Sequence, residues 1–117
     1  MKDNQLLNLS KTFAVSIVNL DAEIKRRGKA NAIVSQLLRS GTSVGANVHE
    51  ANYAQSKADF ISKLQIALKE CYETDYWLDL FQATDIITQE EFDTMSAQCN
   101  KIHRLLIASI KTAKENI

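Results

Sequence analysis

Apolar residues recur along this chain at alternating steps of three and four, the spacing that places side chains on one face of an α-helix. The pattern divides the chain into four segments, and it predicts helices over about residues 3–27, 31–54 and 56–83 and from 88 almost to 117. The predicted core stripes are Leu6, Ser10, Phe13, Ile17, Leu20 and Ile24; Leu37, Gly41, Val44, Val48 and Ala51; Phe60, Leu64, Ala67, Cys71, Thr74, Leu78 and Phe81; and Phe92, Met95, Cys99, Ile102, Leu106, Ser109 and Ala113.

Signals for the ends of helices lie at the borders of these segments. Three consecutive cations precede Gly28, an arrangement that favours a helix end, because cations offset the helix dipole and glycine adopts a left-handed conformation. Ser56 fits an N-cap, with Asp59 three residues later. Thr88 and Glu91 form a full capping-box pattern. The third and fourth helices are therefore predicted to begin just after Ser56 and Thr88.

The predicted connections are short, and short connections force successive helices to lie antiparallel. The chain has 117 residues, no proline and three glycines, which indicates few interruptions. No strand pattern, linker or repeat is present. The sequence therefore predicts one all-α domain over residues 1–117, an up-down-up-down antiparallel four-helix bundle.

Two glycines, Gly41 and Gly45, lie inside the second predicted helix. Each costs about 1 kcal/mol relative to alanine in a helix interior. A small residue permits close backbone approach, so we expect a neighbouring helix to press against this face.

Several apolar residues lie beside the core stripes, where a single bundle does not need them. They are Leu7, Ala14, Val18, Ile61, Leu68, Tyr72, Tyr76, Leu105, Ile107 and Ile110. Scattered surface apolar residues are common in soluble proteins. The width of these apolar faces nevertheless favours burial by another subunit, so we expect a homo-oligomer.

Charge and cysteine content narrow the functional classes. The chain has 14 basic and 14 acidic residues, so its net charge of zero does not attract it as a whole to nucleic acid. Cys71 and Cys99 lie on the core stripes without a CxxC spacing, and we interpret them as reduced core thiols. No secretory signal pattern and no run of about 18 apolar residues is present. We expect a cytoplasmic protein that does not span a membrane.

A polar stripe runs beside the apolar one on the second predicted helix. It consists of Ser40, Ser43, Asn47 and Glu50, and the third helix carries Glu70, Glu73 and Trp77 on a comparable face. A di-metal carboxylate site requires Glu-x-x-His pairs, and no glutamate stands three residues before His103. Paired carboxylates also serve as general acid and base, but no nucleophile accompanies Glu70 and Glu73. We interpret these residues as a structural polar network, and expect no catalysis, metal or cofactor.

Basic residues form a local stripe on the fourth predicted helix, at Lys101, Arg104, Lys111 and Lys114. Such cations contact phosphates in nucleic-acid complexes. They are also typical of a solvated helix face, so the two interpretations remain open.

The segment from Arg39 to Phe81, RSGTSVGANVHEANYAQSKADFISKLQIALKECYETDYWLDLF, resembles the bacterial four-helix-bundle proteins known as 23S rRNA intervening-sequence proteins. These are similar to the accessory variability determinant of diversity-generating retroelements. The family pattern is an S-x-x-x-N-x-x-E element followed by a DFI-x-KL-x-IA-x-KE-x-x-E-x-x-YWL-like helix. The matching residues are Ser43, Asn47, Glu50, Asp59, Phe60, Lys63, Leu64, Ala67, Lys69, Glu70, Glu73, Tyr76, Trp77 and Leu78.

This resemblance implies a four-helix bundle, no enzymatic activity and a ring-like homopentamer. Some members are encoded within intervening sequences of ribosomal RNA genes, and the retroelement relatives act with a reverse transcriptase and RNA. The expected role is thus a structural or interaction scaffold, and the alternative is an RNA-binding or reverse-transcriptase accessory protein that uses the basic face.

Overall fold

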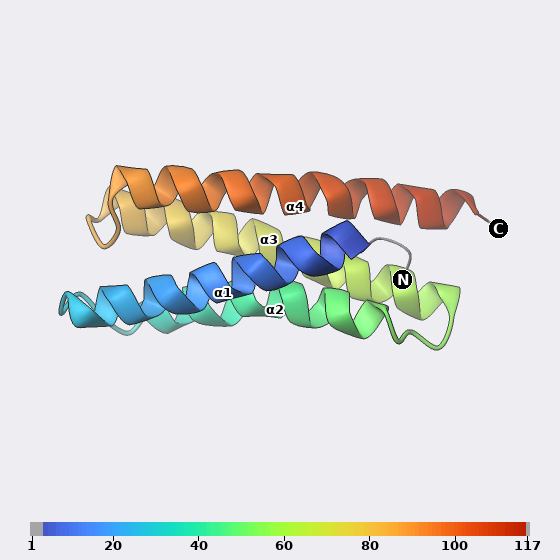
Figure 1. Cartoon of the computed structure of the whole chain (residues 1–117), viewed down its shortest axis with the longest axis horizontal. Helices are drawn as coiled ribbons and strands as arrows, with labels where there is room; N and C mark the ends of the chain where they lie inside the picture. The colour runs from blue at the N-terminus through green and yellow to red at the C-terminus, as the bar shows by residue number, and fades with distance from the viewer. Residues whose placement is uncertain (1–3, 117) are drawn as a thin grey trace.

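Four long helices make up the computed structural model, which describes residues 4–116. α1 spans Asn4–Arg26, α2 Val34–Ala51, α3 Lys57–Ala83 and α4 Gln89–Glu115. Successive helices run in opposite directions along a molecule of 50 × 21 × 20 Å (Figure 1). The predicted all-α, up-down-up-down bundle is confirmed. The predicted first residue of the first helix, Asp3, and the last residue, Ile117, lie outside the described part.

Each helix packs against two neighbours, in the order α1–α2, α2–α3, α3–α4 and α4–α1. The contact between α1 and α4 is the least extensive of the four. Within residues 4–116, the diagonal pairs α1/α3 and α2/α4 do not pack closely backbone to backbone. α1 and α3 therefore occupy opposite corners of the bundle, run in the same direction and end at the same end of it (Figure 1).

The predicted helix ends are confirmed at three positions. The Ser56 hydroxyl accepts a hydrogen bond from the backbone N–H of Asp59 at 3.0 Å. Thr88 and Glu91 form a complete capping box, with distances of 3.1 and 2.9 Å. Gly28 adopts a left-handed φ of 73° two residues after the end of α1. These local interactions satisfy backbone groups that a helix end leaves without intrahelical partners.

α2 is shorter than the predicted residues 31–54, because irregular turns replace both ends. The Asn31 carboxamide oxygen accepts from the backbone N–H of Ile33 at 3.0 Å, which favours a turn over a helix. At the other end, the N–H groups of Tyr53 and Ala54 donate to carbonyls three residues earlier, at 3.0 and 3.1 Å. This tighter turn redirects the chain toward the N-cap of α3.

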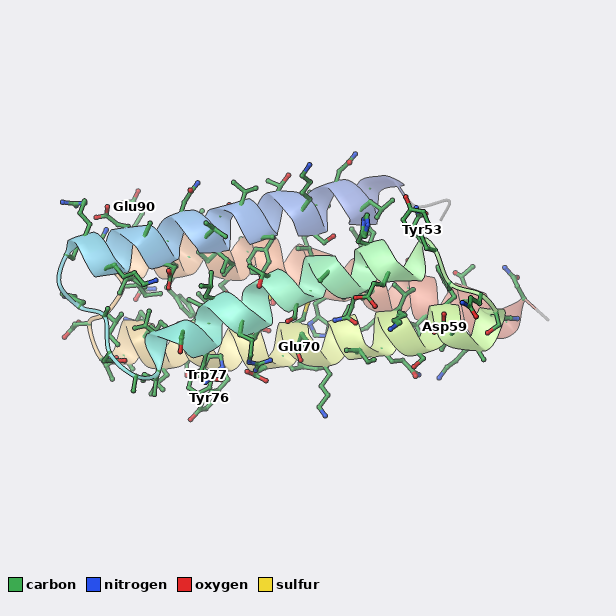
Figure 2. The ribbon with its side chains drawn as sticks, turned by 90° about the horizontal axis from the view of Figure 1, so that it is seen from below. Tyr53, Asp59, Glu70, Tyr76, Trp77 and Glu90 are labelled. Atoms are coloured by element: carbon green, nitrogen blue, oxygen red, sulfur yellow. The ribbon has the colours of Figure 1, made fainter. Side chains whose placement is uncertain are left out.

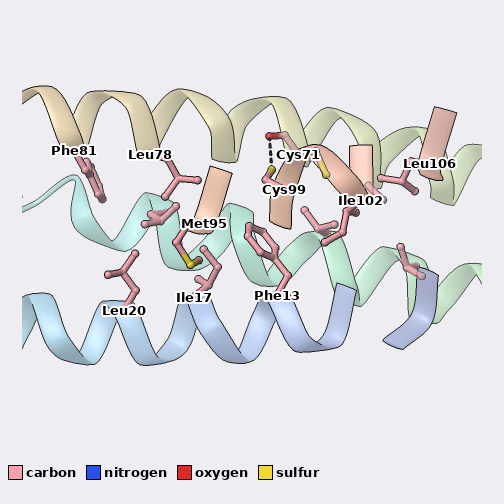
Figure 3. Packing of buried hydrophobic residues seen from close by; sticks show 14 of the residues in the cluster. Phe13, Ile17, Leu20, Cys71, Leu78, Phe81, Met95, Cys99, Ile102 and Leu106 are labelled. Atoms are coloured by element: carbon pink, nitrogen blue, oxygen red, sulfur yellow. Dashed lines mark hydrogen bonds between the residues drawn. The ribbon is translucent and has the colours of Figure 1, made fainter. Parts of the chain in front are cut away.

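The core lies along the bundle axis and takes residues from all four helices (Figure 3). Every predicted stripe residue of α1 and α2 is buried. Phe60 and Phe92, at the start of the stripes of α3 and α4, are half-buried. The α4 stripe also differs at its end, where Ile110 is buried and the predicted Ser109 and Ala113 are half-buried. Buried positions there follow four-residue steps, because a straight helix drifts from a strict heptad repeat.

Both α2 glycines face a neighbouring helix, as predicted, and that helix is α1. A Cβ atom on Gly41 would lie only 2.7–3.0 Å from side-chain atoms of Ile17. A Cβ on Gly45 would lie 3.1 Å from the carbonyl oxygen of Ser10. At Gly41 the two helices therefore approach more closely than a larger residue would allow without a shift of Ile17, and at Gly45 the space for a Cβ is tight.

The two cysteines are free and buried, in agreement with the prediction of core thiols. The Cys99 sulfur lies 3.7 Å from the carbonyl oxygen of Cys71, across the α3–α4 contact (Figure 3). The neighbouring Cys71 and burial both raise the pKa of the Cys99 thiol. Both groups thus behave as packing residues of the core.

None of the helices within residues 4–116 has the length and apolar character needed to cross a bilayer.

Candidate functional site

A polar cluster lies along the edge between α2 and α3, where Figure 2 labels Glu70 and Trp77. One carboxylate oxygen of Glu73 accepts from the Trp77 indole N–H at 3.0 Å and also from the Arg39 guanidinium. The same guanidinium lies 3.5 Å from a carboxylate oxygen of Glu70. Arg39 therefore joins two carboxylates of α3 to α2. We call Arg39, Glu70, Glu73 and Trp77 the arginine cluster.

Within this cluster Glu73 and Arg39 stabilise each other's charged forms. The hydrogen bond from Trp77 and that from Arg39 lower the pKa of Glu73 below its usual value. The same carboxylate raises the pKa of Arg39. Glu73 therefore remains an anion over the neutral range, paired with a permanent cation. A group of this kind is suited to holding two helices in register, because it is not poised to exchange a proton near neutral pH.

A second polar contact lies in the interior, beside the arginine cluster. The hydroxyl oxygens of Ser40 and Thr74 are 3.0 Å apart, and both residues are fully buried. Thr74 Oγ1 also lies 2.8 Å from the carbonyl oxygen of Glu70, and Ser40 Oγ lies 3.4 Å from that of Leu37. Buried hydroxyls normally have such partners. We call Ser40 and Thr74 the hydroxyl pair.

The other predicted network residues do not join these two groups. Ser43 donates to the Arg39 carbonyl at 2.7 Å, and Asn47 donates to the Ser43 carbonyl at 2.9 Å, so both bond within α2. Glu50 is exposed and pairs with Lys63 at 3.0 Å. The predicted stripe is thus three separate sets of contacts along one edge.

Sequence reasoning placed Thr74 in the apolar stripe and did not assign it a polar partner. The available signal was a hydroxyl residue in a stripe of large apolar residues, next to a helix with Ser40 on its flank.

An ion pair between helix ends was also not predicted. Arg27 donates to both carboxylate oxygens of Glu91, at 2.8 and 2.6 Å, and to Glu23 at 2.7 Å.

This ion pair connects the end of α1 to the start of α4. Hydrogen bonds from Arg26 and Arg27 lower the pKa of Glu23 to about 2. Those from Arg27 and from the Thr88 backbone lower the pKa of Glu91. Glu91 therefore serves both as a capping residue and as an interhelical anion.

Across residues 4–116 no group of three or more His, Cys, Asp and Glu side chains is placed to hold a metal ion.

The predicted basic stripe lies on the outer surface of α4. Lys101, Arg104, Lys111 and Lys114 are all exposed, and none has a salt-bridge partner within the described chain. Lys111 and Lys114 also border a shallow groove of 460 Å³ between α3 and α4. The four cations are thus free to meet an external anion.

Large apolar side chains are exposed on α1, on α3 and, at Ile107, on α4. On α1, Val15 and Val18 are 52% and 50% exposed. On α3, Tyr72 and Tyr76 are 52% and 59% exposed. Tyr72 also contacts His103, with 2.8 Å between its hydroxyl and the imidazole Nε2. These positions are opposite the core stripes of their helices, so the monomer leaves apolar surface uncovered on two sides.

A comparison with models of protein families identifies the family of this chain. The model of the 23S rRNA-intervening sequence protein family matches residues 2–108. The chain belongs to this family. The resemblance stated from the segment between Arg39 and Phe81 is therefore confirmed, and it extends over nearly the whole chain. A search of curated proteins gives no match.

A solved member of the S23 ribosomal protein family has the same fold. It is a crystal structure of a protein with unknown function from Bacteroides thetaiotaomicron, with 48% sequence identity and a TM-score of 0.88. The similarity covers 91% of the present chain and 98% of that one. The four-helix architecture is thus shared over essentially the full length of that family member.

Proposed function

We propose that this member of the intervening-sequence family is a non-enzymatic, homo-oligomeric scaffold. The observation that carries the proposal is the pair of exposed apolar faces, one with Val15 and Val18 on α1 and one with Tyr72 and Tyr76 on α3. Each face shows apolar residues at helical spacing on the side of the helix that turns away from the core. Exposed apolar residues that gather on one face of a helix are candidates for an interaction site.

The polar groups fit the same role. The arginine cluster holds a carboxylate in its ionised form between two helices, and the hydroxyl pair satisfies two buried groups within the bundle. Both arrangements fix the relation of α2 to α3. A rigid α2–α3 edge would hold the outer faces of the bundle at constant positions, as a repeating assembly requires.

Five copies are the expected number, on the basis of the ring-like pentamers that the family resemblance implies. Light scattering after size-exclusion chromatography tests the proposal directly. The expected mass is about five times 13.1 kDa. A mass of a single chain at micromolar concentration would contradict the scaffold proposal. A stable multiple other than five would retain the scaffold and reject the pentamer.

A second candidate function is RNA binding through the α4 face, either alone or as an accessory to a reverse transcriptase. The four exposed cations without carboxylate partners favour it, because such groups release counterions when they meet phosphates. The family description refers to intervening sequences of 23S rRNA. In a ring, this face would be repeated once in every copy, which would multiply a weak contact.

Fluorescence anisotropy with a short structured RNA tests this candidate over a series of salt concentrations. Binding is expected at low salt and should weaken with a linear dependence on the logarithm of the salt concentration. Charge reversal of Lys101, Arg104 and Lys111 together should abolish it. Lys111→Ala should reduce the slope by about one unit. Lys57→Ala, on an exposed lysine of α3, is the matched control and should leave the slope unchanged. No binding at low salt would reject the RNA role.

A further inference from the structure

We infer that the outer groove between α3 and α4 binds an amphipathic helix of another protein, one whose apolar face is flanked by aspartates and glutamates. The inference goes beyond the proposed scaffold, because it names a partner of different sequence and holds for a single chain as well as for an oligomer. Its basis is an apolar groove that lies among cations without carboxylate partners in the described structure.

The groove lies where α3 begins and α4 ends, at the same end of the bundle (Figure 1). Its volume is 460 Å³. Ile110 is buried and Leu68 is half-buried against the core, so these two residues form its floor. Ile107 borders the groove from α4 and is 46% exposed. The monomer therefore leaves this apolar groove open to solvent.

A contact between side chains bounds the groove toward the middle of the bundle. The Tyr72 hydroxyl lies 2.8 Å from His103 Nε2 and so bridges α3 and α4. Tyr72 follows Leu68 by four residues and His103 precedes Ile107 by four, which places the bridge one helical turn from the groove. From Ile107 to Glu115 the groove runs along about 12 Å of α4, at 1.5 Å per residue. About two turns of a bound helix match this length.

Cations surround this groove and give its end of the α3–α4 hairpin a positive charge. Residues 57–69 contain three lysines and one aspartate, and residues 101–116 contain four Lys and Arg and one glutamate. Lys111 and Lys114 line the groove itself, together with the carboxylate of Glu115. Of the seven cations, Lys63 alone has a salt-bridge partner within residues 4–116. This end therefore attracts a negatively charged partner, although the net charge of the chain is zero.

The combination of apolar surface and cations selects the kind of partner. A phosphate backbone needs cations and no apolar floor, whereas an apolar floor gains free energy only when apolar groups cover it. An amphipathic helix supplies both kinds of group, because residues four positions apart share a face and its flanks carry charge. Two leucines at that spacing would cover Leu68, Ile107 and Ile110. Glutamates beside them would meet Lys111 and Lys114.

Fluorescence anisotropy with a designed peptide tests the inference. The probe is a labelled helix of about 16 residues, long enough to be helical in isolation, with leucines at the i, i+4 spacing on one face and glutamates on both flanks. It should bind the parent chain, with an affinity that falls as the salt concentration rises. A peptide of the same composition in scrambled order should bind roughly tenfold more weakly or not at all. The same is expected of a peptide with lysine in place of every glutamate.

Substitutions in the groove separate its apolar part from its charged part. Ile107→Ser should weaken binding of the probe about tenfold and leave the salt dependence unchanged. Lys111→Glu combined with Lys114→Glu should weaken binding by about tenfold or more and remove most of the salt dependence. Tyr53→Ser and Lys11→Glu are matched controls outside the groove and should leave the affinity unchanged. All five positions are exposed, so each variant should keep the helical circular dichroism spectrum of the parent.

Three results would overturn the inference. The first is no binding of the designed peptide at low salt. The second is binding that the lysine substitutions weaken and Ile107→Ser does not, because a contact of charges alone does not use the groove. The third is binding of vesicles of phosphatidylserine and phosphatidylcholine that depends on Ile107, without binding of the peptide, which would assign the groove to a lipid surface. Each of these results leaves the proposed homo-oligomer intact, because light scattering measures it separately.

Discussion

The two flanks of α2 hold their neighbours by different means. Toward α1, Gly41 and Gly45 remove side-chain volume, and the contact depends on backbone approach against Ile17. Toward α3, Arg39 and Ser40 provide polar groups that find carboxylates and a hydroxyl. One flank is defined by shape and the other by hydrogen bonding.

The difference predicts how each flank responds to substitution. A shape-dependent contact is disturbed by added atoms, because interiors are already close-packed. A hydrogen-bonded contact is disturbed by removal of one partner, because the other is left buried and unsatisfied. The same helix should therefore be sensitive to enlargement on one side and to truncation on the other.

The largest effect is expected for Gly41→Val, which adds a branched side chain where a Cβ alone would lie 2.7–3.0 Å from Ile17. Overpacking of this kind costs about 1–3 kcal/mol, and the crowding here favours roughly 3 kcal/mol. Urea denaturation measures the loss. Adding Ile17→Ala to Gly41→Val should produce a smaller combined loss than the sum of the single losses. An unchanged midpoint for Gly41→Val would show that the close approach is not required.

An intermediate effect is expected for the hydroxyl pair. Thr74→Val keeps the shape and leaves the buried Ser40 hydroxyl without its α3 partner, at a cost of about 1–2 kcal/mol. Ser40→Ala combined with Thr74→Val should cost less than the two single changes together, because replacement of both partners leaves no orphan. Chemical denaturation of the four chains gives this coupling energy, and strict additivity would contradict the contact.

The smallest effect is expected for the arginine cluster, because Arg39 is about half exposed. The folded state lowers the pKa of Glu73 below the 4.5 of an unperturbed glutamate. Its contribution is therefore fully present above pH 4.5 and is lost as the pH falls through the folded-state pKa. The difference in unfolding free energy between the parent and Glu73→Gln should shrink in that acidic range. A difference that stays constant from neutral pH to below pH 4.5 would exclude this origin.

Much of the fold was predictable because a helix that packs against a core requires apolar residues at steps of three and four along the sequence. Ser56 and Thr88 marked the starts of α3 and α4 through local hydrogen bonds, and these depend only on residues three positions away. Gly41 and Gly45 indicated a close neighbour because glycine is otherwise costly in a helix. The resemblance to the intervening-sequence family added the same architecture independently.

The candidate site was less predictable because helical spacing gives the face of a residue but not its partner. Ser43 and Asn47 share a face with Ser40, yet their side chains bond to carbonyls of their own helix. The partner of a polar residue depends on how far one helix is shifted along another. The sequence of a single helix does not determine this shift. The bond from Arg27 to Glu91 joins residues 64 positions apart and required the packed bundle to be seen. The late start of α2, at Val34, had a local signal in Asn31, whose turn competes with the helix.

The burial of both native thiols has a practical consequence for measuring how this molecule opens. Cys71 and Cys99 are buried at the α3–α4 contact, and the neighbouring Cys71 and burial raise the pKa of the Cys99 thiol, which disfavours its reactive thiolate. Alkylation by a small reagent should therefore wait for separation of these two helices. The rate of thiol labelling should therefore report the rate at which α3 and α4 separate. Mass spectrometry can follow this labelling on the native cysteines, so no probe has to be introduced.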